Sequence, residues 1–334
     1  MVKFLFVNTQ PAQCSIHESG KQIFAAMDNC PHWDITYVEI SDIDRQALFQ
    51  YRKFILHDGT DLGDFDAYVI NYHDITMRNA HRINGELKAG LDPSLLTALN
   101  APVFGIILEV EPNDPWPRLH EDVFNGYFVI DPTLKYPDPR FIACPRPLPP
   151  PSTHHYADPG RPVIGSFGFP TRDKSFDKIV KAVSEEFDSA IVRLNIPRAT
   201  FLDDNQDRDF EKIAQSCYDA AKPGIEVIIT REFFTDERLI EWCAENTLNV
   251  FLYTRDMPGL AAVTDQAIAS GRPLAVSDNR TFRHIHEYIV PYPARSLRES
   301  IAVSQAEVQQ MQQNWSHEAF QNTIHAALFG DDNE

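Results

Sequence analysis

Short apolar segments alternate along this chain with segments whose apolar residues recur every three or four positions. The short segments are rich in β-branched and aromatic residues, which is typical of buried strands. They predict strands at Lys3–Val7, Ile35–Glu39, Ala67–Asn71, Val103–Leu108, Tyr127–Ile130, Val163–Phe167, Ala190–Leu194, Glu226–Thr230, Asn249–Tyr253 and Leu274–Ser277. Helical spacing is clear over Phe176–Phe187 and Phe210–Ala221. This alternation predicts an α/β protein with parallel sheets covered by helices.

A proline-rich segment divides the pattern into two halves. Cys144–Pro162 reads CPRPLPPPSTHHYADPGRP, a composition that the interior of a helix or strand does not tolerate. Such a connector is extended and fairly stiff. We therefore predict a Rossmann-like domain over residues 1–146, a linker over 147–161, a second Rossmann-like domain over 162–310 and a C-terminal helix over 311–334. Two such domains would face a cleft at the carboxyl edges of their sheets, where open α/β sheets bind ligands.

Charge and composition narrow the classes of partner. The 334 residues carry 30 basic and 48 acidic side chains, a net charge of −18, which opposes non-specific binding to nucleic acid or to an anionic membrane. No apolar run approaches the roughly 18 residues of a membrane span. The 5 cysteines are scattered without a C-x-x-C pair, which indicates free thiols. We expect a cytoplasmic protein with no transmembrane segment and no nucleic-acid partner.

The first candidate binding segment is Val163–Ala182. A strand runs into a loop that contains Gly165, Ser166 and Gly168, and an amphipathic helix follows. Glycines let a backbone approach a ligand closely, and a helix N-terminus attracts anions. Arg172 and Lys174 would add positive charge for a diphosphate. The alternative is an ordinary strand–helix turn with two solvated cations.

The second candidate segment is Met257–Asp278. Pro258 opens a loop of small residues that leads into a short helix, for which Thr264 is the expected N-cap. Small side chains at a helix start leave backbone N–H groups open to an anion. Taken alone, the segment is also explained by helix capping and packing.

Together these segments resemble the retaining, family-four glycosyltransferases of the GT-B fold. In that family a glycine and a lysine open the C-terminal domain with the spacing that Gly168 and Lys174 have here. The family's later segment, E-G-F-G-L-P-x-x-E-A-x-A-x-G-x-P-V-V-A-S, aligns with Pro258–Ser277 without a gap. The likeness extends over about 163–285 and is looser in the N-terminal half.

The resemblance implies roles for particular residues. Lys174 matches the lysine that binds the diphosphate of the donor, and Gln266 matches the residue that contacts the ribose. The implied diphosphate-binding set is Gly165, Ser166, Gly168, Arg172, Lys174, Gly259, Leu260, Ala261, Ala262 and Val263.

Two departures from the family pattern concern charge. Phe169 stands in place of the family's arginine, and Pro258 and Gln266 stand in place of its paired glutamates. The contact with the donor sugar would then fall to Asp265 or Asp256.

Candidate residues in the N-terminal half follow its predicted strands. Ser15 stands in the expected acceptor loop, and His73 is placed where such enzymes often carry a histidine beside the cleft. Glu109 and Glu111 end a strand and would recognise acceptor hydroxyls. The alternative for His73 is a structural histidine, and the alternative for Glu109 and Glu111 is that they are solvated carboxylates. The paired histidines His154/His155 and His284/His286 lack acidic or cysteine partners, so we expect no metal.

The resemblance implies transfer of a sugar from a nucleotide-diphosphate sugar to a glycan, lipid-linked or protein acceptor, with retention of configuration, in glycan or polysaccharide synthesis. The nucleotide sugar would be a co-substrate, and no cofactor is expected. His73 and Asp265 are the predicted catalytic residues. The last helix resembles one that crosses back onto the N-terminal domain in the family. The alternative function is a GT-B nucleotide- or glycan-binding protein that is inactive or catalytically weak.

Overall fold

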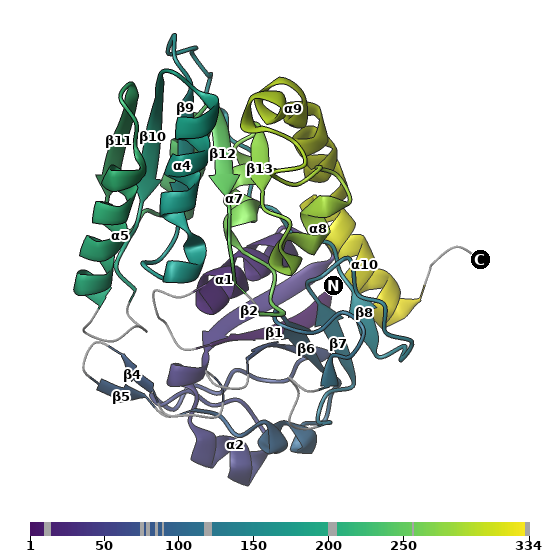
Figure 1. Ribbon diagram of the computed structural model, residues 1–334. Coiled ribbons are helices and arrows are strands. Elements are labelled where there is room, and N and C mark those ends of the chain that lie inside the picture. The colour runs from purple at the N-terminus through teal and green to yellow at the C-terminus, as the bar shows by residue number, and fades with distance from the viewer. Residues whose placement is uncertain are drawn as a thin grey trace. The chain divides into compact units, whose positions relative to one another are not determined.

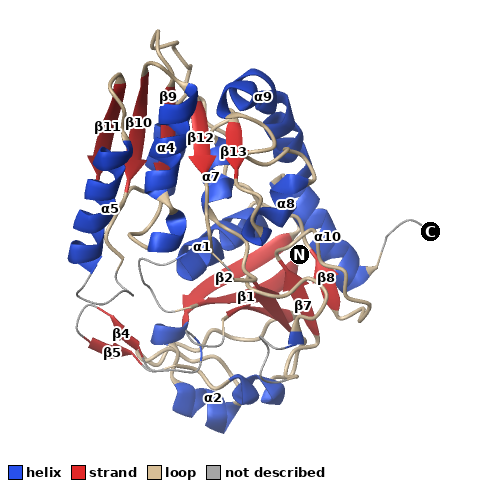
Figure 2. Cartoon of the chain, viewed as in Figure 1, coloured by secondary structure: helices blue, strands red, loops and turns tan. Residues whose placement is uncertain are grey.

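The computed structural model describes residues 1–9, 15–73, 77, 81–83, 86–88, 90–116, 122–199, 206–255 and 257–330. The chain divides into two compact units. Unit 1 comprises Met1–Pro147 with Ser316–Glu334, and unit 2 comprises Leu148–Trp315. Each unit is built on a parallel sheet with helices packed against it (Figures 1 and 2).

Unit 1 contains a 6-stranded parallel sheet with the order β2-β1-β3-β6-β7-β8. Its strands are β1 (Val2–Asn8), β2 (Trp33–Glu39), β3 (Ala67–Tyr72), β6 (Val103–Ile107), β7 (Gly126–Val129) and β8 (Phe141–Ala143). The helices are α1 (Ser15–Asp28), α2 (Arg45–Tyr51) and α10 (His317–Phe329), with 3-10 turns η1 (Ile40–Asp42) and η2 (Pro93–Ala98). A separate antiparallel hairpin pairs β4 (His81–Ile83) with β5 (Glu86–Lys88).

Side-chain alternation along β1 divides the core of unit 1 into two layers. Phe4 and Phe6 point to the face covered by α1 and α10, and Leu5 and Val7 point to the other face. All four are fully buried, because both faces of a parallel sheet are covered. Among the residues that α10 adds are Phe320 and Ile324, so the end of the chain belongs to the core of unit 1.

Unit 2 contains a 5-stranded parallel sheet with the order β11-β10-β9-β12-β13. Its strands are β9 (Val163–Phe167), β10 (Ala190–Asn195), β11 (Ile225–Thr230), β12 (Leu248–Phe251) and β13 (Leu274–Val276). The helices and turns are η4 (Arg172–Lys174), α4 (Phe176–Glu186), α5 (Gln206–Ala220), α6 (Asp236–Ala244), α7 (Val263–Ala269), η5 (Arg280–Phe282), α8 (Arg283–His286) and α9 (Leu297–Asn314).

Two apolar clusters cover the faces of this second sheet. One joins α4 and α5 to the sheet through residues such as Ile179 and Cys217. The other joins α6, α7 and α8 through residues such as Trp242, Ile268 and Ile285. Strands and helices thus follow the predicted periodicity, and every predicted strand has a counterpart, while β8 and the β4–β5 hairpin were not predicted.

The proline-rich segment belongs to unit 2 from Leu148 onward. Leu148 is buried in its core, the Tyr156 hydroxyl hydrogen-bonds Thr247 Oγ1 at 2.9 Å, and the Arg272 guanidinium lies 3.5 Å from the centre of the Tyr156 ring. The predicted domain limit at residue 310 lies inside α9, which ends at Asn314. The predicted limit is wrong, because Met311 and Trp315 pack in the core of unit 2, which extends to Trp315.

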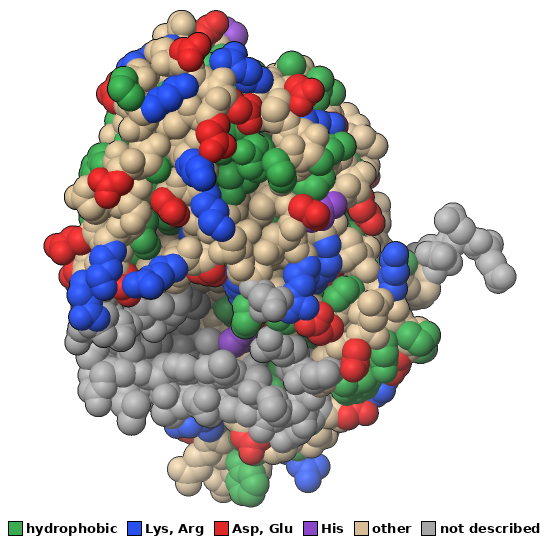
Figure 3. Space-filling view, in the orientation of Figure 1, with side chains coloured by type: hydrophobic (Ala, Val, Ile, Leu, Met, Phe, Trp, Pro, Cys, Tyr) green, Lys and Arg blue, Asp and Glu red, His purple; other side chains and the backbone are tan. Residues whose placement is uncertain are grey.

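The surface mixes both signs of charge. On the face drawn in Figure 3, lysine and arginine side chains gather over α4 and α5, with acidic side chains among them. Within the described ranges, no helix is long and apolar enough to cross a membrane.

Candidate functional site

The Lys174 side chain lies just beyond the carboxyl end of β9. The loop after β9 forms the short turn η4, and Ser175 then adopts a left-handed conformation with φ 52° before α4 begins at Phe176. The Ser175 hydroxyl contacts Thr254 Oγ1 at 3.1 Å, and the Thr254 N–H donates to the Asp173 carbonyl at 2.9 Å. These bonds fix the turn to the loop after β12, so the backbone that carries Lys174 is held at two points.

The ammonium group of Lys174 rests on an aromatic ring. Its Nζ lies 3.9 Å from the centre of the Tyr253 ring, and the described residues provide it with no ion pair. Although part of the residue is exposed, desolvation lowers the pKa of Lys174 to about 7; Asp173 opposes this shift and Arg255 adds to it. An amine with this pKa gains a proton readily when an anion arrives, because the anion favours the charged form.

The predicted glycine loop begins later than expected. Gly165 and Ser166 lie within β9 and are buried, so they are not loop residues. A Cβ atom at Gly165 would overlap the Asn246 amide, so this glycine is required by packing inside the sheet. Gly168 is in the loop with φ 147°, and a Cβ there would lie 3.5 Å from Lys174 Cε. Of the three residues, Gly168 is the one placed beside the candidate site.

Arg172 does not share a cavity with Lys174. Its side chain is exposed and lines a cavity of about 640 Å³ between the start of α4 and the middle of α5, and Lys174 does not line this cavity. The structure therefore does not bring the two predicted cations of this loop to one cavity. Lys178 and Lys212 are other cations on its wall.

The second candidate loop is fixed from beneath by the segment that follows β13. The Asn279 amide donates to the Arg255 carbonyl, the Thr281 hydroxyl to Gly259 and Arg283 to Pro258, at 2.6–2.8 Å. These contacts join the described residues of the loop after β12 to the segment that follows β13.

Burial limits which parts of the loop meet a ligand. Gly259, Leu260 and Ala261 are buried, and the Ala261 N–H already donates to Thr281. Ala262 and Val263, at the start of α7, are partly exposed. The predicted N-cap is wrong: α7 begins at Val263 with Ala262 as N-cap, and the Thr264 hydroxyl donates to the Ala261 carbonyl at 2.8 Å.

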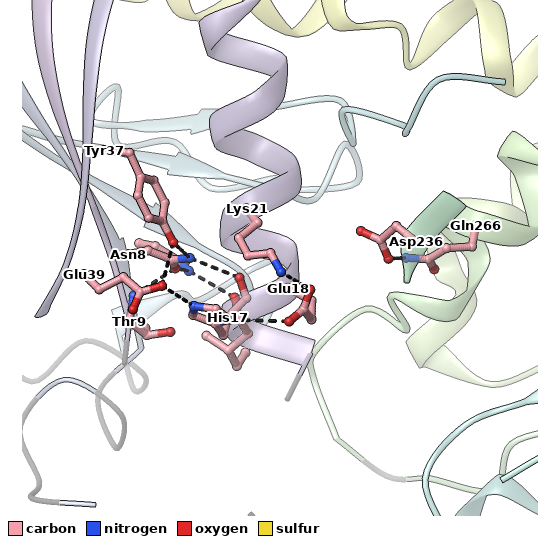
Figure 4. A network of polar contacts seen from close by, with 11 residues as sticks. Asn8, Thr9, His17, Glu18, Lys21, Tyr37, Glu39, Asp236 and Gln266 are labelled. Atoms are coloured by element: carbon pink, nitrogen blue, oxygen red, sulfur yellow. Dashed lines mark hydrogen bonds and ion pairs between the residues drawn. The ribbon is translucent and has the colours of Figure 1, made fainter. Parts of the chain in front are cut away.

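The two predicted polar residues of α7 have different surroundings. Asp265 is 2% exposed, so its carboxyl group is enclosed by the protein. Gln266 donates from Nε2 to Asp236 Oδ1, the first residue of α6, at 3.4 Å (Figure 4). A carboxylate thus stands beside Gln266, although the sequence predicted none there. Asp256 lies outside the described residues.

Unit 1 brings together a predicted catalytic residue and a predicted acceptor-side residue. His73 Nε2 lies 3.7 Å from Glu109 Oε2, just beyond the adjacent strands β3 and β6, and both side chains are partly exposed. Glu111 lies further along in a local turn with Asp114, and Ser15 is the exposed first residue of α1. His73 and Glu109 therefore form a pair at the carboxyl edge of the sheet.

A polar network that the sequence did not predict occupies the same edge of unit 1. His17 Nε2 lies 2.9 Å from Glu39 Oε1, and its Nδ1 lies 3.5 Å from Glu18 (Figure 4). The Asn71 amide donates to Asn8 Oδ1 at 2.7 Å, and the Asn8 amide donates to the Tyr37 hydroxyl at 2.9 Å. Asn8 is the last residue of β1 and Asn71 the last but one of β3; polar residues at the ends of buried strands are the signal that could have identified them.

The carboxylates determine the charge of His17. Burial is the largest single influence and lowers its pKa, but hydrogen bonds and charge interactions with Glu18 and Glu39 outweigh it, so the pKa of His17 is raised. His17 and Lys21 in turn hold the pKa of Glu18 below its usual value against the effect of burial. The network therefore balances its charges internally.

Metal-binding groups are not assembled in the part of the chain that the structure describes. No cluster of three or more histidine, cysteine or acidic side chains there is suited to a metal ion. Cys144 and Cys243 are buried, and burial raises the pKa of both thiols.

No protein-family model matches the sequence, and no curated protein matches it significantly. Solved structures do match. HepE from Anabaena, in complex with UDP and glucose, superposes with a TM-score of 0.62 at 10% identity, over 98% of this chain and 99% of that chain. An alpha,alpha-trehalose-phosphate synthase (UDP-forming) from Burkholderia vietnamiensis has a TM-score of 0.60 at 12% identity, over 98% and 97%. A trehalose-6-phosphate structure from E. coli, bound with UDP-2-fluoro glucose, has a TM-score of 0.55 at 11% identity, over 98% and 96%.

These likenesses confirm the predicted fold class. The chain has two Rossmann-like α/β units whose parallel sheets are covered by helices, as in GT-B glycosyltransferases. At such low identity the likeness concerns the fold, and the role of each residue has to be argued from its own surroundings.

Proposed function

We propose that this protein is a metal-independent glycosyltransferase that moves a hexosyl group from a nucleotide-diphosphate sugar to an acceptor hydroxyl. The observation that carries the proposal is Lys174: a cation of lowered pKa, without an ion pair in the described residues, beyond the carboxyl end of β9 in a GT-B fold. Solved structures with this fold hold UDP-glucose or UDP-2-fluoro glucose. Both ligands carry the diphosphate that such a cation would bind.

Catalysis would be mainly electrostatic. As the bond between sugar and diphosphate breaks, negative charge develops on the leaving diphosphate, and a fixed cation stabilises this charge most in the transition state. Lys174 is held by its turn and by the Tyr253 ring, so it needs little reorganisation. Ala262 and Val263 are partly exposed residues at the start of α7, and their N–H groups would assist.

The pair Gln266–Asp236 would bind the ribose of the donor. Adjacent ribose hydroxyls each donate and accept hydrogen bonds, and an amide beside a carboxylate offers both kinds of partner. Asp236 would supply the charge-assisted bond that Gln266 lacks.

On the acceptor side, His73 and Glu109 are the proposed contacts. A histidine beside a carboxylate can take up a proton or orient a hydroxyl. We further propose that transfer retains the anomeric configuration, that it serves glycan synthesis in the cytoplasm, and that the acceptor is a glycan, a lipid-linked sugar or a protein.

A second candidate is a nucleotide- or glycan-binding protein of the same fold without turnover. Pro258 favours it, because this residue offers no carboxylate to the donor sugar and its carbonyl is bound by Arg283. Asp265, the predicted substitute, is enclosed.

The test has two stages. Titration calorimetry with UDP, ADP and GDP would detect nucleotide binding, and radiolabelled UDP-glucose and other nucleotide sugars would detect hydrolysis or transfer. Binding with turnover supports the glycosyltransferase, and binding without turnover of any donor supports the second candidate. Failure of every nucleoside diphosphate to bind contradicts the glycosyltransferase and leaves only the glycan-binding form of the second candidate.

A further inference from the structure

Two phenylalanine rings from separate loops of unit 2 lie parallel to each other. The Phe169 and Phe233 ring centroids are 6.4 Å apart with an interplanar angle of 17°. Phe169 follows β9, and Phe233 follows β11. Phe233 is 43% exposed, so a large part of its aromatic side chain is open to solvent.

A single asparagine holds both loops. Asn195, which ends β10, accepts the Gly168 N–H on its backbone carbonyl at 3.1 Å. Its side-chain amide donates to the Glu232 carbonyl at 3.0 Å, and its side-chain oxygen accepts from Thr230 Oγ1 at 2.9 Å. Asn195 is 2% exposed, so these bonds are protected from water. Each phenylalanine is next in sequence to a residue fixed in this way.

The position of the rings connects them to the proposed donor site. Phe169 follows Gly168, which packs beside the Lys174 side chain, and Phe233 precedes Asp236 by three residues. The backbone thus leads from the diphosphate contact to one ring and from the other ring to the ribose pair Asp236–Gln266. The base of a nucleoside diphosphate is bonded to the ribose, so a surface for the base is expected beside the ribose contact.

We propose that Phe233, with Phe169 behind it, forms the surface on which the nucleobase of the donor stacks. This inference rests on the proposed function, because it assigns the base end of the same ligand. Phe169 would then serve the base, where the resembled family has an arginine for the diphosphate.

Stacking predicts a particular kind of selectivity. Every base has a π-face, so an aromatic platform binds uracil, adenine and guanine without strong preference. It contributes nothing to a ligand that has no base. Inorganic pyrophosphate is therefore the informative comparison, since it presents a diphosphate to Lys174 without a base.

The experiment measures the affinity of the full chain for UDP, ADP and inorganic pyrophosphate by titration calorimetry. Base–aromatic stacking predicts that Phe233→Ala weakens binding of UDP and ADP roughly 5- to 150-fold. Phe233→Leu, which keeps apolar volume without a π-face, should lose a similar factor, and Phe233→Trp should retain affinity. Pyrophosphate binding should be unchanged in all three variants. Tyr218→Ala on α5 removes another exposed aromatic side chain of unit 2, 50% exposed, and should alter none of these affinities.

A spectroscopic readout complements the affinities. The H5 and H6 protons of bound uracil should shift upfield in the NMR spectrum of the wild type and of Phe233→Trp, because an aromatic ring shields protons above its face. The Leu variant should lack most of this shift.

The outcomes separate the two proposals. If the wild type binds no nucleoside diphosphate, the proposed function fails. If it binds UDP and ADP but Phe233→Ala and Phe233→Leu bind them as tightly, the donor site stands and the platform is overturned. Equal losses for nucleotides and pyrophosphate would also overturn it, because Phe233 would then act only by shaping the loop. Circular dichroism and the melting temperature verify that each variant folds, as expected for an exposed side chain.

Discussion

The carboxyl edges of the two sheets handle charge in opposite ways. In unit 1, His17 lies between Glu18 and Glu39, and Lys21 pairs with Glu18 at 2.8 Å. In unit 2, the Lys174 ammonium lies over the Tyr253 ring, and the described residues give it no ion pair. The first edge neutralises its own charges, whereas the second keeps a cation available for an anionic ligand. Anion binding is therefore expected in unit 2.

Both units contain a glycine packed against a pair of asparagines. Substitution of these glycines has the largest effect on stability that we expect. A Cβ at Gly20 would overlap the Asn8–Asn71 pair, and a Cβ at Gly165 would overlap Asn246, which bonds Asn249 at 2.8 Å. Overpacking predicts that Gly20→Ala and Gly165→Ala each lower the free energy of unfolding by about 1–3 kcal/mol, measured by denaturant titration.

A matched control and a second readout sharpen this prediction. Gly105→Ala should lower the free energy of unfolding by less, because the nearest neighbour of a Cβ at Gly105 would be the Ile107 side chain at 3.3 Å. Folded Gly165→Ala should bind UDP as tightly as the wild type, since Gly165 is enclosed in β9. A weakened affinity with normal stability would restore the predicted role of Gly165 in binding.

The periodicity of apolar residues predicted the strands of both sheets well, because it reflects which residues are buried. The limits of a site are harder to predict. Gly165 and Gly168 look alike in sequence, but one packs on Asn246 and the other lies in the ligand-side loop. Which residues lie opposite a glycine depends on strand register, and a single sequence does not display it.

The same limit explains the residues that were missed. Gln266 and Asp236 are 30 positions apart, and Asn8 and Asn71 are 63 apart, so their pairing arises from the order of strands and helices. In the sequence, Phe169 was identified only as the residue in place of the family's arginine. Its pairing with Phe233 depends on how the two loops are arranged in the fold.

Removal of the unit 2 cation is the next prediction. Lys174→Met keeps an unbranched side chain of similar length but removes the charge, and we expect at least a tenfold loss of UDP affinity, about 1.4 kcal/mol. Lys181→Met removes an exposed lysine of α4 and should leave the affinity unchanged. Equal affinities for wild type and Lys174→Met in calorimetry would exclude Lys174 from the site.

The pKa of Lys174 predicts how this affinity depends on pH. In the free protein the ammonium form is lost as pH rises through about 7, whereas a bound diphosphate favours it. UDP affinity should therefore fall by up to about tenfold per pH unit above pH 7, and binding should take up a proton. Calorimetry at pH 8 in buffers of different ionisation enthalpy measures this uptake. It should disappear in Lys174→Met, and its persistence there would assign the proton to another group.

The smallest expected effect concerns the balanced charges of unit 1. The pKa of His17 is raised, so its contribution to stability is fully present below the unfolded value of 6.5 and is lost as pH rises through the folded pKa. The advantage of the wild type over His17→Gln, about 1 kcal/mol near pH 6, should thus shrink toward pH 8. Lys174 has the opposite sign: its lowered pKa means that the folded state binds fewer protons than the unfolded state between about 7 and 10.5, so this lysine makes stability rise with pH. Denaturant titrations from pH 6 to pH 9 on wild type, His17→Gln, Lys174→Met and the exposed control His57→Gln separate the two slopes. If both variants changed the slope in the same direction, the two edges would not differ in charge balance, because only a histidine held by carboxylates and a lysine without them give slopes of opposite sign.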